Sequence, residues 1–346
     1  MTDRNTKIAI AIAVIFIIAT IVVLLGQQNG EKEKTVVVYT SVDQVYSEPV
    51  FRSFEEETGV KVLPVYDVEA TKTTGLVNRL IAEKARPQAD VFWSGEFSQT
   101  IVLKNEGVLT PYRSPSTADI PAQFKDADDY WTGFGGRARV FIVNTDLLAP
   151  SQYPHSVYDV LDEKYPAKTV GIAKPMFGTT ATQAAAMYSY LGEEKARAFF
   201  TSLNNRGVQV VDGNSVVRDR VVDGQIAFGL TDTDDACGPV ESKKNVTIII
   251  PDQGPGELGT LVIPNTVALI AGGPNPEEGK IFMDYLLDKQ READMVASGW
   301  IQIPARNIPG SPCINSTGIK TIPVTYQDTY NSLESSQKDL ITLFIR

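Results

Sequence analysis

Two short segments of this chain carry charged side chains that could bind a ligand. The acidic segment, Thr231-Asp232-Thr233-Asp234-Asp235, directly follows an apolar run. Three carboxylates at a strand end can bind a hard cation or an ammonium group, but they can also cap the next helix without any ligand. In the basic segment, Arg137 and Arg139 stand two residues apart. One of them can clamp an oxyanion with two parallel hydrogen bonds, although both can equally be surface charges.

Hydroxyl and amide groups supply a second set of candidate ligands. Thr40 and Ser41 end the first apolar strand that the sequence predicts after residue 34. Residues 178–180, Gly-Thr-Thr, begin a predicted helix, and the exposed amides of a helix start attract oxyanions. A threonine at this place can also be a simple N-cap. Asn214 opens another predicted helix in the same way.

Little in the sequence points to catalysis or to nucleic-acid binding. The chain has one histidine, His155, in a loop-like Pro-Tyr-Pro-His-Ser segment, and no nucleophile with a base partner stands out. A Gly-x-Gly-x-x-Gly pattern at 254–259 contains a proline and leads into a strand, so we predict a loop there and no dinucleotide site. The net charge of −10 argues against a nucleic-acid partner. We therefore expect a binding protein that is not an enzyme.

Alternating strands and helices must position these groups. Short apolar runs predict strands, and amphipathic segments between them predict helices. This alternation indicates an α/β architecture with a largely parallel sheet, which binds ligands in a cleft at the carboxyl ends of its strands. The predicted strands are 36–39, 60–65, 89–93, 138–143, 169–173, 208–211, 226–230, 260–263 and 266–270, and the predicted helices are 48–58, 73–84, one opening at Ser156, those from Thr180 and Glu193, 215–222 and 276–298.

An apolar run at 8–25 follows Arg4 and Lys7. Its length is near the ~20 residues that span a bilayer, and no cleavage site or lipid-attachment cysteine follows it. We predict an uncleaved signal-anchor, with a tether that ends at residue 34 and the rest of the chain outside the cytoplasm.

The chain has two cysteines, Cys237 and Cys313. In an exported protein they can form a disulfide or remain free and buried. The sequence leaves both possibilities open.

Several segments, taken in order, resemble the ferric-ion-binding branch of the extracellular solute-binding proteins of ABC transporters. The resemblance extends from residue 36 to about residue 307. The matching segments are Val38-Tyr39-Thr40-Ser41, Phe54-Glu55-Glu56-Glu57-Thr58-Gly59, Ala89-Asp90-Val91-Phe92-Trp93, Gly136-Arg137-Ala138-Arg139-Val140, Asn214-Ser215-Val216 and Ile303-Pro304.

The resemblance implies a type II periplasmic-binding-protein fold with a hinge of crossing segments. It divides the chain into an anchor and tether at 1–34, a first lobe at 36–136 and 265–346, and a second lobe at 137–264. It also implies an ABC permease and its ATPase as partners, and we expect a monomer.

The sequence departs from the iron-binding members at the metal ligands. Thr233 and Asp234 stand where those members carry a tyrosine pair, and Asp43 stands in place of their histidine. Glu96 lies near the position of their glutamate. The resemblance thus leaves three ligand classes open: Fe(III) held by Asp43, Glu96 and Asp234; a zwitterion such as an aminophosphonate; and a sugar phosphate.

We accordingly expect a substrate-binding protein of an ABC importer, with Arg137 meeting an anion and Fe(III), if present, as the transported ligand and not a cofactor. A membrane-anchored receptor subunit that senses the ligand for a signalling partner is the alternative, and a hydrolase that uses the acidic segment with a metal is a third reading. The expected ligand-binding residues are Thr40, Ser41, Asp43, Glu96, Arg137, Gly178, Thr179, Thr180, Asn214, Asp232 and Asp234.

Overall fold

The computed structural model describes residues 33–66 and 74–345, and their strands form one continuous sheet with the order β2-β1-β3-β10-β5-β8-β6-β7. Strand β4 joins this sheet beside β10, and β9 joins it beside β5. The strands are β1 (Thr35–Thr40), β2 (Lys61–Tyr66), β3 (Val91–Ser94), β4 (Leu109–Thr110), β5 (Thr132–Asn144), β6 (Val170–Ala173), β7 (Gln209–Val211), β8 (Phe228–Asp232), β9 (Val246–Ile249) and β10 (Val262–Ile270).

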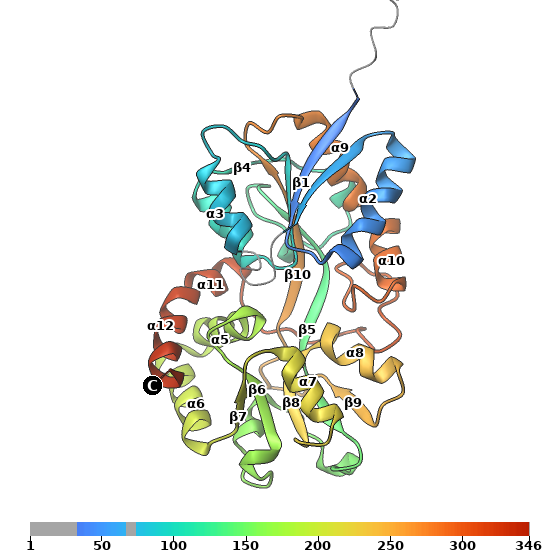
Figure 1. Cartoon of the computed structure of the whole chain (residues 1–346). Helices are drawn as coiled ribbons and strands as arrows, with labels where there is room; N and C mark the ends of the chain where they lie inside the picture. The colour runs from blue at the N-terminus through green and yellow to red at the C-terminus, as the bar shows by residue number, and fades with distance from the viewer. Residues whose placement is uncertain (1–32, 67–73, 346) are drawn as a thin grey trace, which may run out of the picture.

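The helices fall into two groups that cover the two ends of this sheet (Figure 1). We call the end with β1 to β4 the first lobe and the end with β6 to β9 the second lobe. The helices are α2 (Gln44–Thr58), α3 (Thr74–Ala82), α4 (Ser98–Asn105), α5 (Gly178–Leu191), α6 (Glu193–Arg206), α7 (Asn214–Val222), α8 (Thr233–Glu241), α9 (Pro276–Leu286), α10 (Lys289–Ala297), α11 (Tyr326–Asn331) and α12 (Leu333–Phe344).

Parallel pairing brings the carboxyl ends of neighbouring strands together in each lobe. In the first lobe β1 pairs in parallel with both β2 and β3, and in the second lobe β6 pairs in parallel with β7 and β8. Strand β3 is buried along its whole length, which is typical of parallel strands covered by helices on both faces. The predicted α/β architecture is confirmed.

Two long antiparallel strands, β5 and β10, run from one lobe to the other (Figure 1). The sequence predicted two separate strands, 260–263 and 266–270, but β10 is continuous through Pro264 and its register against β5 only shifts between Pro264 and Asn265. The backbones approach closely here, because a Cβ atom on Gly136 would lie 2.1 Å from the carbonyl oxygen of Ile263. Only glycine fits such an approach.

Local hydrogen bonds explain two further differences from the predicted elements. The region 276–298 forms two helices, because the carboxylate of Asp288 caps α10 by accepting from the amide of Gln290 at 2.8 Å. Ser156 and Asp159 form the predicted capping box, but it opens a short 3-10 helix, Val157–Leu161. The strand β9 and the helix α4 were not predicted. The segment 254–259 is a loop, as expected.

The C-terminal end of the chain packs on the second lobe. Helix α12 lies against α5 and α6, and Asp339 forms an ion pair with Arg197 of α6. The sequence had grouped 265–346 with the first lobe, so the placement of these last residues differs from that grouping. The cause is the amphipathic character of α12, whose buried Leu340 belongs to the apolar core it shares with α5 and α6. The remaining lobe boundaries stay a prediction.

Cys237 and Cys313 form a disulfide, which settles the question that the sequence left open. The bond joins α8 of the second lobe to the segment that follows α10. Within 33–66 and 74–345, no helix combines the length and the apolar character that a membrane span needs. The predicted anchor at 8–25 lies outside the described residues.

Candidate functional site

A buried ion pair stands at the point where β5 and β8 pair. Arg139 and Asp232 are directly opposite each other in the antiparallel register. The Nη1 atom of Arg139 lies 2.7 Å from Oδ1 of Asp232, and the two side chains are 0% and 3% exposed. A buried charge is tolerated only when it is paired and hydrogen-bonded, so this pair is part of the framework. The alternative that both arginines are surface charges is therefore wrong.

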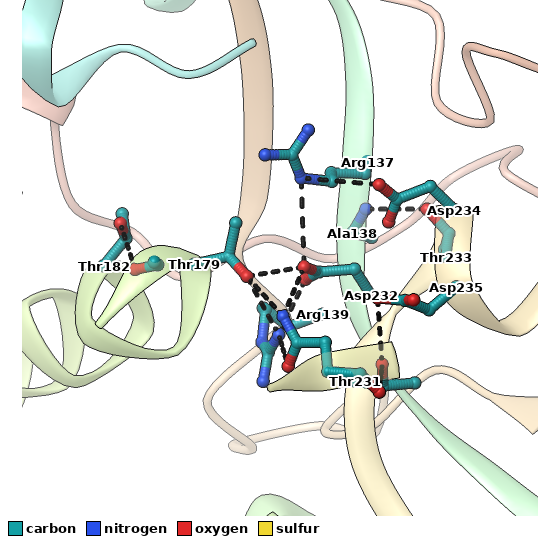
Figure 2. A network of polar contacts seen from close by, with 12 residues as sticks. Arg137, Ala138, Arg139, Thr179, Thr182, Thr231, Asp232, Thr233, Asp234 and Asp235 are labelled. Carbon is teal, nitrogen blue, oxygen red and sulfur yellow. Dashed lines mark hydrogen bonds and ion pairs between the residues drawn. The ribbon is translucent and has the colours of Figure 1, made fainter. Parts of the chain in front are cut away.

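Four residues of α5 and α7 complete the partners of this ion pair, namely Thr179, Thr180, Gln183 and Asn214. The hydroxyl of Thr179 donates to Oδ2 of Asp232 at 2.5 Å. The side-chain amide of Asn214 donates to the same oxygen through Nδ2 at 2.9 Å. Arg139 in turn donates to Oε1 of Gln183 at 2.9 Å. Figure 2 shows how these contacts surround Asp232. Each carboxylate oxygen of Asp232 thus accepts at least one hydrogen bond from a protein donor.

Arg137 lies on the same face of β5, two residues before Arg139. Among the residues that the structure describes, none accepts a hydrogen bond from its Nε atom. That atom is 3.9 Å from Oδ2 of Asp232 and 4.0 Å from Oδ2 of Asp234, which is too long for a hydrogen bond (Figure 2). The side chain is 22% exposed. Burial lowers the pKa of Arg137, but the charges of Asp234 and Asp232 outweigh burial and raise it. The guanidinium is therefore a permanent cation with an unused donor.

Three helices begin around Arg137 and Asp232 without a side-chain cap. Helix α5 begins at Gly178, α7 begins at Asn214 and α8 begins at Thr233, and none of the three N-cap residues makes a side-chain hydrogen bond to its helix. The alternative that Thr179 or Thr180 is the N-cap of α5 is wrong, because Phe177 holds that position. Uncapped helix starts present amides and the positive end of the helix dipole. Together with Arg137 they favour an oxyanion at this place.

Two carboxylates of the first turn of α8 lie at the same site. Asp234 is 43% exposed, and Asp235 accepts a hydrogen bond from Arg218 at 3.3 Å. Burial, followed by repulsion from Asp234 and Asp232, raises the pKa of Asp235 to about 7. Burial and Asp232 also raise the pKa of Asp234, although Arg137 opposes them. Asp234 and Asp235 therefore share less than two negative charges near neutral pH.

The predicted ligands of the first lobe have other hydrogen-bonding partners. Glu96 caps α4, because its carboxylate accepts from the amides of Ser98 at 2.6 Å and Gln99 at 2.9 Å. Thr40 is fully buried, and its hydroxyl accepts from the amide of Val42 at 3.0 Å. Neither side chain needs a ligand to satisfy it.

Ser41 and Asp43 follow the carboxyl end of β1. The hydroxyl of Ser41 accepts from the amide of Gly95 at 3.2 Å, and a Cβ atom on Gly95 would lie 3.9 Å from Nη1 of Arg137. The carboxyl end of β3 therefore reaches the guanidinium of Arg137. Asp43 precedes α2 and is exposed, and its carbonyl accepts from the amides of Tyr46 and Ser47.

The acidic residues do not gather as the sequence suggested. In the part of the chain that the structure describes, the group of acidic residues close enough to share a metal ion is Asp232, Asp234 and Asp235, whose ligand atoms lie within 4.8 Å of one another. The proposed set of Asp43, Glu96 and Asp234 does not form such a group. Asp43 and Glu96 belong to the first lobe, and the capping bonds of Glu96 hold it at α4.

Sequence reasoning missed two residues of this site. Gln183 follows Thr179 by four residues and so lies on the same face of α5, a spacing that could have suggested it. Asp235 belongs to the acidic segment but was not among the expected ligands. The structure brings together Arg137, Thr179, Thr180, Asn214, Asp232 and Asp234 from the predicted set.

Residues 87–315 match the family model of the bacterial extracellular solute-binding proteins. This chain belongs to that family. The match spans the interlobe strands, all three helix starts and both arginines. The proteins of this family bind solutes, which accords with a site made of unused donors and helix starts.

Three proteins illustrate what this solute-binding protein is similar to. A putative 2-aminoethylphosphonate-binding periplasmic protein of Salmonella typhimurium is 27% identical over 263 residues, covering 75% of this chain and 74% of the relative. A probable ABC transporter periplasmic-binding protein of Sinorhizobium fredii is 29% identical over 280 residues, with 75% and 74% covered. The structure of a ferric binding protein from Campylobacter jejuni superposes with a TM-score of 0.79 at 21% identity, covering 90% of this chain and all of that one. The last likeness shows the periplasmic-binding-protein fold.

Proposed function

We propose that this solute-binding protein captures a small oxyanion between its lobes and delivers it to the permease and ATPase of an ABC importer. It works outside the cytoplasm, as a monomer held to the membrane by the predicted anchor at 8–25. The names of the relatives from Salmonella and Sinorhizobium support this function. The two lobes joined by β5 and β10 support closure around the ligand.

The observation that carries the proposal is the unused Nε donor of Arg137. A buried donor without a partner is costly, and an oxyanion would satisfy it. Arg139 cannot take this role because Asp232, Gln183 and Thr179 already accept from it. The uncapped starts of α5 and α7 would add amide donors to the same anion.

Fe(III) is a second candidate ligand. The group formed by Asp232, Asp234 and Asp235 offers the oxygen atoms that hard cations prefer, and the structural likeness to ferric binding proteins favours it. Asp232 already accepts from Arg139, Thr179 and Asn214, which weakens it as a ligand. The elevated pKa of Asp235 also means that a bound cation must displace a proton there.

Calorimetric titration of the full-length chain in mild detergent tests the proposal. The probes are inorganic phosphate, ethylphosphonate and ferric iron with carbonate. We expect a phosphorus oxyanion to bind the wild type and the Arg137→Ala variant to lose at least about 30-fold in affinity, because a charge-assisted pair is lost.

The matched control is Arg52→Ala, which removes an arginine that is 71% exposed on α2. It should leave the affinity unchanged. Equal affinities of wild type and Arg137→Ala for the oxyanion would contradict the proposed site. Binding of ferric iron alone, unaffected by Arg137→Ala, would support the second candidate instead.

A further inference from the structure

Two aromatic side chains from distant parts of the chain stack on each other. Tyr46, in the first turn of α2, stacks on Trp300, which follows α10, with 6.0 Å between ring centroids and 23° between planes. Tyr46 is 41% exposed, and Trp300 packs edge-on against the buried Trp93 with centroids 5.5 Å apart. The buried ring of Trp93 therefore supports Trp300, while part of the Tyr46 ring stays accessible to solvent.

The amide of Gln302 fixes this pair relative to the acidic start of α8. Its Nε2 atom donates to the carbonyl oxygen of Trp300 at 3.1 Å, and its Oε1 atom accepts from the hydroxyl of Thr233 at 3.2 Å. Gln302 is 2% exposed, so this bridge is buried. Because Asp234 follows Thr233 directly, one buried side chain joins the backbone of Trp300 to the turn of α8 that carries Asp234.

The carboxylates at the start of α8 act on Tyr46 electrostatically. Burial raises the pKa of Tyr46, and the negative charges of Asp234, Asp43 and Asp235 raise it further. Tyr46 belongs to the first lobe and Asp234 to the second, so the two lobes face each other here. The guanidinium of Arg137 lies 4.0 Å from the carboxylate of Asp234, too far for a hydrogen bond.

We propose that Tyr46, Trp300 and Asp234 form a subsite for a protonated primary amine, and that they make the protein selective for a zwitterion whose oxyanion binds Arg137. Aromatic faces attract a cation through their quadrupole, and a partly exposed carboxylate supplies the opposite charge. This inference rests on the proposed oxyanion-binding function and defines its ligand class.

The balance of charges at the site favours this class over a dianion without an amine. The positive charge of Arg139 is taken up by Asp232, and that of Arg218 is shared by Asp219 and Asp235. Of the three arginines described at this site, Arg137 remains to meet a phosphorus oxyanion, while Asp234 would repel it. An amine on the same ligand turns that repulsion into attraction.

The test compares two probes that differ only in the amine. Calorimetric titration of the full-length chain uses 2-aminoethylphosphonate and ethylphosphonate, with wild type, Tyr46→Leu, Tyr46→Phe and Trp300→Leu. We expect the wild type to prefer the amine at least about 30-fold, and the leucine variants to reduce this preference by about 3- to 30-fold while ethylphosphonate binds as before. Tyr46→Phe keeps the ring and should keep the preference.

Tyr190→Leu is the matched control, because Tyr190 is 46% exposed on α5 and has no part in the site. It should change neither affinity. Equal affinities of the wild type for the two probes would overturn the amine subsite and leave the oxyanion site standing. A leucine variant that weakens both probes equally would also overturn it. If neither probe binds the wild type, the amine subsite fails, and if inorganic phosphate does not bind either, the oxyanion function fails with it.

Discussion

Arg139 and Asp232 face each other across β5 and β8 with 2.7 Å between Nη1 and Oδ1, and neither side chain is more than 3% exposed. Arg137, two residues earlier on the same strand, reaches the same carboxylate only at 3.9 Å. The register of the two strands therefore gives the two arginines different functions. Arg139 stabilises the fold through its ion pair with Asp232, whereas Arg137 remains available to bind a ligand.

Replacing Arg139 with methionine should destabilise the protein strongly. Asp232 would remain as a buried carboxylate without its cation, and breaking a buried pair from one side costs about 3–5 kcal/mol. Urea unfolding of the full-length chain measures the loss. Arg137→Met should cost less than about 1 kcal/mol, since Arg137 makes no close ion pair. Equal losses in the two variants would contradict this division of roles.

The stability should depend on pH through Asp235. Its pKa is about 7 in the folded protein and about 3.9 when unfolded, so the folded state holds an extra proton between these values. The free energy of unfolding should then fall as the pH rises from about 4 to about 7, by at most about 1.4 kcal/mol per pH unit from this group. Urea unfolding across this range measures the slope.

The variant Asp235→Asn should lose this part of the slope, because asparagine does not titrate. Asp223→Asn is the control, since Asp223 is exposed at the end of α7. A wild-type slope that Asp235→Asn leaves intact would assign the titration to another group.

Glu96 should matter for stability and not for ligand affinity. Its carboxylate accepts from two amides at the start of α4, and loss of such a cap costs about 0.5–2 kcal/mol. Glu96→Ala should lower the free energy of unfolding by about this amount, while the affinity for the oxyanion that binds the wild type stays within about twofold. If Glu96→Ala instead lowered the affinity for ferric iron by more than twofold, Glu96 would be a metal ligand.

The disulfide between Cys237 and Cys313 should contribute to stability. It closes a loop between residues 76 positions apart, which corresponds to about 4 kcal/mol in the chain-entropy model. Urea unfolding of wild type with and without a thiol reductant, beside the Cys237→Ala, Cys313→Ala double variant, measures it. Reductant should lower the stability of the wild type alone. An equal effect of reductant on the double variant would contradict a role for the disulfide.

The sequence alone determined the α/β architecture, the family resemblance and most of the anion-binding candidates. These features are local: apolar periodicity sets each strand and helix, and a helix start follows from the residues around it. The acidic segment at 232–235 and Arg137 were recognisable because charged groups after or within apolar strands stand out. The loop at 254–259 was predictable for the same reason, from its glycines and proline.

The tertiary structure decided how those groups are used. Which arginine pairs with Asp232 depends on the register between β5 and β8, and residues two apart on a strand are indistinguishable before that pairing forms. Cys237 meets Cys313, and Tyr46 meets Trp300, only because the sheet brings distant segments together. Local patterns fix what an element is, whereas partners distant in the chain are fixed by packing and long-range pairing.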